Sequence, residues 1–213
     1  MNNKKRLMLW GVAMLLLVSA AAVAAISPQQ TVKNAIDEVL NILADPKLDA
    51  QNRDRAVRKK IHQIVDERFD FRSMSQSVLA TNWQKATAYE RDRFVDFFAQ
   101  SLENTYVGAI ESYTGEQIKY TGEKIRGDRA VVDTVIVSKK GEIPVSYKMK
   151  LDNDVWRAYD VVIEQVSLVN NYRTLYANII KSEGVNGLLD RLEGKLEKYR
   201  QKKGKGRQNQ AAK

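Results

Sequence analysis

The spacing of apolar residues changes near residue 117, and this change restricts the folds open to the chain. Before that point apolar side chains recur every three or four residues, which indicates amphipathic helices. We expect helices at residues 28–45, 53–68, 72–79 and 87–113, and two more after the strands at residues 170–183 and 185–199. From Gln117 the period is two, which predicts strands at Gln117–Thr121, Arg129–Ser138, Glu142–Asp152 and Val155–Glu164. This order predicts an α+β fold, with N-terminal helices and a curved four-stranded antiparallel sheet wrapped by helices.

The connections between the expected strands are short. Lys139-Lys140-Gly141 and Asp152-Asn153-Asp154 are typical of hairpin turns, so we expect an antiparallel meander. In the third strand apolar and polar residues alternate, which predicts one face against the helices and one face in water. The residues expected against the helices are Ile143, Val145, Tyr147, Met149 and Leu151.

The N-terminus has the three parts of a secretory signal. Lys4, Lys5 and Arg6 precede an apolar run from Leu7 to Val18, and small residues follow as far as Ala25. We predict a signal peptide at residues 1–24, with an uncleaved membrane anchor as the alternative, although the apolar run is shorter than the ~20 residues of a spanning helix. A single α+β domain should then occupy residues 25–197, with a helical part at about 25–114 and the sheet and C-terminal helices at about 115–197.

Basic residues are concentrated at the C-terminus. Residues 198–213 contain seven lysines and arginines and no acidic residue. The formal charge of the whole chain is +9. Without these seven residues and the three basic residues of the predicted signal, the charge of the remaining domain is about −1. We expect a disordered basic tail, because the segment has almost no apolar residues. It either keeps the chain soluble or makes transient contact with a partner protein or with anionic headgroups at a membrane surface. Nucleic acid is not an expected partner of an exported chain.

Groups suited to catalysis or metal binding are scarce in the sequence. The chain has no cysteine and one histidine, which excludes thiolate chemistry and zinc sites built from several such ligands. No metal or cofactor is therefore expected. Asp133 and Asp160 lie within predicted strands, where aspartate is depleted. They leave open a small hydrolase that uses two carboxylates, although pairing with Arg129, Arg157 or Arg173 would also account for them.

An ordered set of short motifs runs through most of the mature chain. The motifs are Phe69-Asp70-Phe71-x-x-Met74, Val78-Leu79, Trp83, Phe94, Phe98, Thr105-Tyr106, Tyr113, Trp156-x-x-Tyr159-Asp160-Val161, Glu164-x-Val166-Ser167-Leu168-Val169 and Asn171-Tyr172-Arg173. From about Pro28 to Leu196 this set resembles the periplasmic MlaC family, also called the toluene-tolerance auxiliary family. Two positions depart from the pattern, because Ala80 and Gln165 stand where relatives usually carry glycine.

The resemblance implies a soluble phospholipid carrier of the Gram-negative periplasm, without enzymatic activity. Such carriers belong to the Mla pathway. They shuttle lipid between an outer-membrane lipoprotein–porin complex and an inner-membrane ABC transporter complex with its substrate-binding subunit, and so maintain outer-membrane lipid asymmetry. The implied fold is a sheet like that of nuclear transport factor 2, with added helices. The residues alone leave two other functions open, an envelope scaffold that carries no ligand and the small hydrolase.

A carrier of diacyl lipid needs a large apolar cavity. Exposing about thirty methylenes would cost on the order of 25 kcal/mol at about 0.8 kcal/mol each, and the cavity should approach about 1,000 Å³. The predicted lining residues are Phe97, Leu102, Tyr106 and Ile110 of the long central helix, Val145, Tyr147, Met149 and Leu151 of the sheet, and Tyr172, Tyr176 and Ile179 of the next helix. Arg173 is predicted either to meet the phosphate headgroup at the mouth or to hold Asp160 or a helix end.

Overall fold

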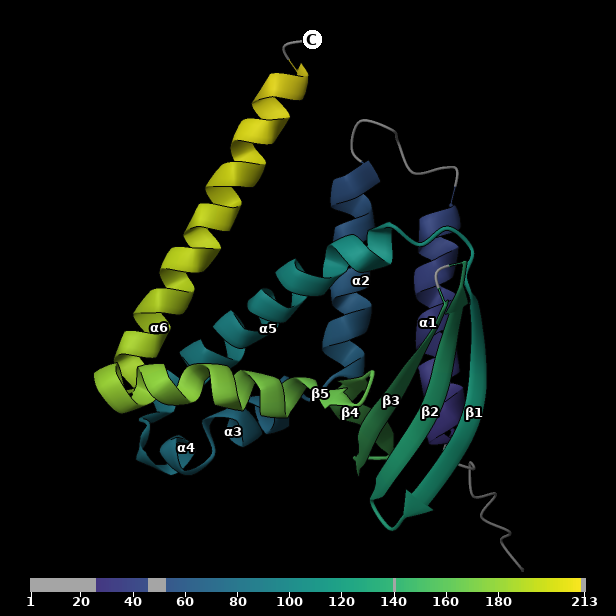
Figure 1. Cartoon of the computed structure of the whole chain (residues 1–213), viewed down its shortest axis with the longest axis horizontal. Coiled ribbons are helices and arrows are strands. Elements are labelled where there is room, and N and C mark those ends of the chain that lie inside the picture. The colour runs from purple at the N-terminus through teal and green to yellow at the C-terminus, as the bar shows by residue number, and fades with distance from the viewer. Residues whose placement is uncertain (1–25, 46–52, 140, 212–213) are drawn as a thin grey trace, which may run out of the picture.

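The computed structural model describes residues 26–45, 53–139 and 141–211, so the predicted signal peptide at residues 1–24 lies outside the described residues. The helices are α1 (Pro28–Ala44), α2 (Arg53–Arg68), α3 (Phe71–Leu79), α4 (Thr81–Lys85), α5 (Ala88–Glu111) and α6 (Leu168–Ala211). The strands are β1 (Gln117–Arg126), β2 (Arg129–Ser138), β3 (Gly141–Asp152), β4 (Val155–Ile163) and β5 (Val166–Ser167). Helices precede and follow the strands, which confirms the predicted α+β class (Figure 1). Within these ranges no helix combines the length and the apolar character that crossing a bilayer requires.

Side-chain caps begin two helices where the sequence predicts them. The Ser27 hydroxyl accepts a hydrogen bond from the Gln30 N–H at 3.1 Å, and Pro28 opens α1. At α5 the side chains of Thr87 and Glu90 each accept a hydrogen bond from the other's backbone N–H, which forms a capping box. These bonds satisfy N–H groups that a helix leaves without a partner at its start. The positions of these two starts are therefore set by neighbouring residues.

The five strands form one antiparallel sheet in the order β1-β2-β3-β4-β5. The predicted number of four strands is wrong, because the two residues of β5 turn back and pair with the end of β4. β1 also runs to Arg126, past its predicted end at Thr121, since a register shift at Gly122 lets the pairing with β2 resume. The likeness of this sheet to that of nuclear transport factor 2 stays a prediction.

The C-terminal helix α6 has two parts. At Gly184 the backbone takes φ 73° and ψ −175°, outside the helical range, and the chain changes direction there (Figure 1). The sequence predicts a helix end at this glycine, because glycine adopts a positive φ without strain. The segment from residue 198, for which the sequence predicts disorder, is helical as far as Ala211. Lysine, arginine and glutamine dominate this segment and are good helix formers even without an apolar stripe.

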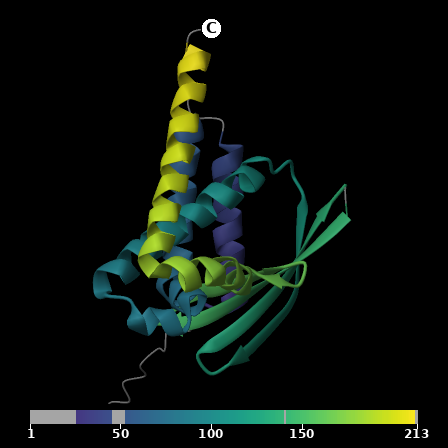
Figure 2. The same ribbon diagram turned by 60° about the vertical axis from the view of Figure 1, so that its left-hand side comes forward.

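One face of the sheet is covered by two separate groups of helices (Figures 1 and 2). α3, α5 and α6 cover one end of this face and form what we call the large cluster, and α1 covers the other end and forms the small cluster. The buried members of the large cluster are Met74, Val78, Leu79, Trp83, Phe94, Phe98, Leu102, Val145, Val161, Leu168, Val169, Tyr172, Tyr176, Leu188, Leu189 and Leu192. Those of the small cluster are Val32, Ala130, Val132, Met149 and Trp156.

Candidate functional site

The inner face of the sheet carries the residues that the sequence places there. Val145 and Met149 are buried and Tyr147 and Leu151 are half-buried, so alternate residues of β3 face the helices as predicted. The Tyr147 side chain packs against both clusters, and burial raises its pKa to about 12. Tyr147 therefore marks the line where the two helix groups meet on the sheet. A role for these side chains in lining a lipid cavity stays a prediction.

The central helix α5 contributes a buried stripe and a half-buried edge. Its predicted lining residues are Leu102, which is buried, and Phe97, Tyr106 and Ile110, which are half-buried. Phe94 and Phe98 are fully buried, with parallel rings 5.7 Å apart, whereas Phe97 lies 5.1 Å from the Arg93 guanidinium at the edge of the helix. The predicted lining residues of α5 therefore do not include its two most deeply buried aromatic residues. Phe94 and Phe98 are four residues apart, and this helical spacing indicates that both lie on the buried stripe.

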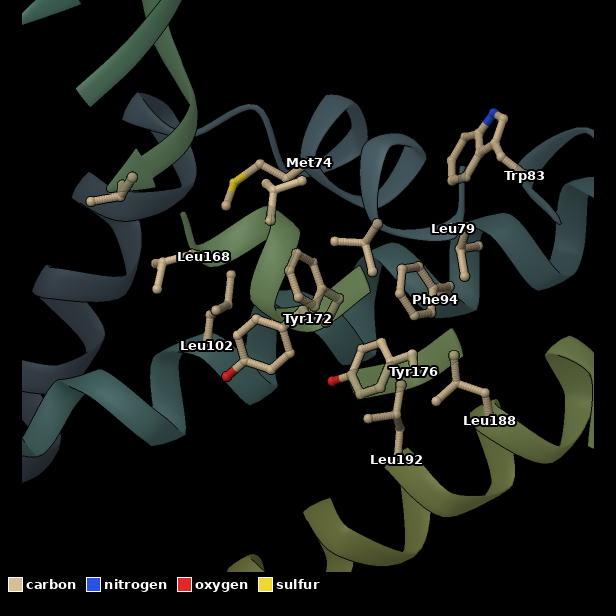
Figure 3. Close-up of a cluster of buried hydrophobic side chains, with 14 of the residues drawn as sticks. Met74, Leu79, Trp83, Phe94, Leu102, Leu168, Tyr172, Tyr176, Leu188 and Leu192 are labelled. Carbon is tan, nitrogen blue, oxygen red and sulfur yellow. The ribbon is translucent and has the colours of Figure 1, made fainter. Parts of the chain in front are cut away.

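Two tyrosines of α6 pack against this stripe (Figure 3). The Tyr172 ring meets the Phe98 ring edge-on at 5.3 Å, and the Tyr176 ring meets the Phe94 ring in the same way at 6.1 Å. Such edge-to-face pairs stabilise a core beyond the burial of their area. The third predicted lining residue of α6, Ile179, is half-buried beside the same cluster. The structure thus brings the predicted residues of α5 and α6 together.

The structure has a hollow in a different place from the predicted cavity. An open hollow of about 520 Å³ lies between α1 and α2, lined by Glu38, Asn41, Ile42, Asp45, Lys60, Gln63, Ile64 and Glu67. Most of these side chains are charged or polar, so this hollow does not suit acyl chains. On the sheet face, Val145 and Met149 instead contribute to the two closed clusters. An acyl cavity there requires the helices to move away from the sheet, and it stays a prediction.

Asp160 is buried because it holds the start of α6. Its carboxylate accepts hydrogen bonds from Lys148 Nζ at 2.9 Å, from the Ser167 hydroxyl at 2.7 Å and from the Val169 N–H at 3.2 Å. Three donors and the positive end of a helix dipole compensate for the desolvation of a residue that is only 4% exposed. These bonds account for an aspartate within a strand without a catalytic role.

The sequence offers three arginines as partners for Asp133 and Asp160. All three bind other groups, so the expected pairing is wrong. Arg173 Nε donates to the Ser77 carbonyl at 2.8 Å, which is the helix-end role among its predicted alternatives. Arg157 pairs with Asp152 at 3.5 Å, and Arg129 lies over a tyrosine ring with 5.0 Å between the guanidinium carbon and the ring centroid. The headgroup role of Arg173 stays a prediction.

The remaining polar candidates also take part in local contacts. Asp133 accepts a hydrogen bond from the Ser146 hydroxyl at 2.5 Å across the β2–β3 pair. The two ring nitrogens of His62 lie 3.1 Å from carboxylate oxygens of Asp66 and Glu103. In the part of the chain that the structure describes, no three histidine, cysteine or acidic residues are grouped so that they could hold a metal ion. These contacts tie surface helices and strands together.

The fold and the site define an α+β protein organised around a one-sided apolar sheet and an aromatic helix stripe. A solved structure with a similar fold is the phospholipid-binding protein of Ralstonia solanacearum in complex with a phospholipid. It is 28% identical, has a TM-score of 0.69, and the match covers 80% of this chain and 97% of that chain. The model of the MlaC protein family matches residues 33–194, and the chain belongs to this family, as the resemblance of its motifs predicts.

Two curated relatives agree with this assignment. The toluene tolerance protein ttg2D of Pseudomonas putida is 24% identical over 184 residues, which covers 84% of this chain and 86% of the relative. The intermembrane phospholipid transport system binding protein MlaC of Haemophilus influenzae is 21% identical over 183 residues, covering 83% of this chain and 86% of the relative. Both matches cover more than four fifths of this chain.

Proposed function

We propose that the protein is a phospholipid carrier that encloses acyl chains between the sheet and its helices. The observation that carries the proposal is the inner face of the sheet, which is mostly apolar and contributes to two hydrophobic clusters with different helices. One group of these helices can move away without disturbing the hydrogen bonds of the sheet. Family membership and the related structure, which holds a phospholipid, support the proposal.

Acyl chains on this face replace one apolar contact with another. Separating the helices from the sheet exposes apolar surface at a cost of about 25 cal/mol per Å². Inserted acyl chains cover the same surface again, so the hydrophobic cost is largely returned in the loaded protein. An open protein without lipid keeps the full cost. The carrier is therefore closed when empty and opens only as lipid is transferred.

The chains enter between α2 and α5, which are joined by ion pairs at their surface. Arg58 of α2 pairs with Glu111 of α5, and His62 of α2 with Glu103 of α5. The first pair leaves Arg58 Nε and Glu111 Oε1 enclosed without hydrogen-bond partners among the residues that the structure describes. Ion pairs with partly exposed side chains contribute about 0–1 kcal/mol each. Helices α1 and α2 can thus move away from α5 at a lower cost than α6, whose Tyr172, Tyr176 and Leu188 are buried in the large cluster.

The carrier works in the periplasm after export. It exchanges lipid with an outer-membrane lipoprotein–porin complex and with an inner-membrane ABC transporter complex and its substrate-binding subunit, and it maintains outer-membrane lipid asymmetry without an enzymatic step. The name of the Haemophilus influenzae relative, an intermembrane phospholipid transport system binding protein, supports this setting. The direction of transfer comes from partners that bind the open and closed forms with different affinity.

Placing a charge on the inner face tests the proposal. Met149 is 2% exposed, so Met149→Glu would place a carboxylate among acyl chains at a cost of several kcal/mol. We expect native mass spectrometry of detergent-free exported protein to show a phospholipid mass on the wild type and a greatly reduced share on this variant. Lys150→Glu, one residue along on the wet face, is the matched control and should keep its lipid.

The outcomes separate the proposal from its alternatives. A folded Met149→Glu protein with wild-type lipid content would remove Met149 from the cavity wall. Should that variant fail to fold, Leu151→Glu applies the same test at a half-buried position. A wild-type protein that carries no lipid and takes up none from vesicles would instead point to an envelope scaffold.

A further inference from the structure

Two buried tyrosines of α6 end in hydroxyl groups that no other part of the described chain satisfies. Tyr172 is 8% exposed and Tyr176 is 5% exposed. Neither hydroxyl has a hydrogen-bond partner among the described residues. Neither oxygen is fully enclosed by protein atoms. The two oxygens therefore reach accessible space although their rings are buried. Figure 3 shows both hydroxyls directed to the same side of the large cluster.

A third tyrosine, on the facing helix, lies close to them. Burial raises the pKa of Tyr106, and its proximity to Tyr172 raises it further. Burial and the same neighbour raise the pKa of Tyr176. The Tyr172 and Tyr176 rings lie 5.6 Å apart, and Tyr106 of α5 packs against the same large cluster. Tyr106 and Tyr176 stay protonated at neutral pH, so they offer neutral O–H donors.

Packing does not account for these hydroxyls. Phe94 and Phe98, which the two α6 tyrosines contact, show that plain phenyl rings suit the same core. Both oxygens reach accessible space, so they can donate to a group from outside without breaking a hydrogen bond within the described chain. The phenols carry no charge, which suits an uncharged acceptor.

We propose that Tyr106, Tyr172 and Tyr176 form a donor cluster that binds the ester carbonyl oxygens of a diacyl phospholipid, where the glycerol joins the acyl chains. Neutral donors at the edge of an apolar core match a neutral acceptor at the end of an apolar chain. The cluster would fix the depth to which the lipid enters and leave the headgroup free. This inference rests on the proposed carrier function.

Ester and ether lipids separate this proposal from other uses of the hydroxyls. Wild type and the Tyr172→Phe/Tyr176→Phe variant are loaded from mixed vesicles of diester and diether phosphatidylglycerol with the same chain lengths, and bound lipid is counted by native mass spectrometry. The ether lipid keeps the phosphate but lacks the carbonyl groups. One or two hydrogen bonds correspond to about a tenfold preference of the wild type for the ester lipid. The variant should lose that preference.

The control and the possible results are distinct. Tyr89→Phe removes a hydroxyl from a residue that is 71% exposed and should keep the preference. Equal binding of both lipids by the wild type, or an unchanged preference in the double variant, overturns the proposal and leaves the carrier function intact. Equal weakening of both lipids in the double variant assigns the hydroxyls to the phosphate and also overturns it. A wild type that binds neither lipid contradicts the carrier function itself. Thermal unfolding of each variant confirms that it is folded.

Discussion

Replacing Ala80 with glycine should stabilise the protein. Ala80 joins α3 to α4 with φ 50° and ψ −123°, a region that residues with a Cβ atom rarely adopt. Its N–H donates to the Gln76 carbonyl at 2.9 Å, and its own carbonyl accepts from the Trp83 N–H at 3.1 Å. These two bonds hold the chain in this conformation, so the strain persists in the native state.

The size of the effect follows from two opposing terms. Backbone strain of this kind costs a non-glycine residue about 1–3 kcal/mol. Glycine removes the strain but makes the unfolded chain more flexible, which costs about 0.5–1 kcal/mol. The methyl group of Ala80 is exposed, so its loss removes little packing. The balance is a stabilisation of about 1 kcal/mol, or about 2–4 °C in Tm for a domain of this size.

Thermal and urea unfolding of the mature chain measure this difference. Ala177→Gly is the matched control, because Ala177 is exposed within the helical part of α6 and has no strain to relieve. It should lose about 1 kcal/mol through the lower helix propensity of glycine. A Tm for Ala80→Gly at or below that of the wild type, with the control lowered as expected, would refute the reasoning.

Three other changes test different parts of the structure. Asp160→Asn should lower the free energy of unfolding by about 2–3 kcal/mol in urea, because Lys148 loses its charged partner and two further bonds weaken. Tyr147→Phe should reduce the loss of stability at alkaline pH. The tyrosine ionises near pH 10 in the unfolded chain and at about 12 in the folded chain, so stability falls by about 3 kcal/mol in total as the pH rises through these values. Urea unfolding at pH 9 and 11 should show about 1.4 kcal/mol of this loss in the wild type and not in the variant. Arg58→Cys/Glu111→Cys joined by a short bis-maleimide should not take up lipid from vesicles, whereas the uncross-linked protein should; equal uptake would exclude loading between α2 and α5.

Local chemistry made most element boundaries predictable. Thr87 and Glu90 are three residues apart and fix the start of α5 between them. The alternation along β3 identifies its inner face, because adjacent side chains of a strand point to opposite faces. The sequence predicts a helix end at Gly184, and the positive φ of this residue confirms it. Each of these signals involves only residues close together in the sequence, so it does not depend on how the rest of the chain folds.

Contacts between distant segments could not be predicted in the same way. The sequence offers several arginines for Asp160, but only the folded sheet shows that Lys148 stands beside it on the neighbouring strand. The apolar stripe of α1 predicts an amphipathic helix without showing which part of the sheet it covers. The predicted lining residues therefore include none from α1, although Val32 packs with Met149 in the small cluster.

The second departure from the family pattern shows how backbone strain and the candidate site are connected. Glu164 and Gln165 both have positive φ, at 48° and 69°, in the turn from β4 to β5. Two successive left-handed residues form the tight turn that suits the twist of adjacent strands, and glycine would adopt it at a lower cost. The turn persists because the bond from Val169 to Asp160 fixes the chain a few residues later. Since α6 begins at once after β5, the shape of this turn sets where Tyr172 and its neighbours on α6 meet α5. The strain at the turn is thus offset by the contacts that position the proposed donor cluster.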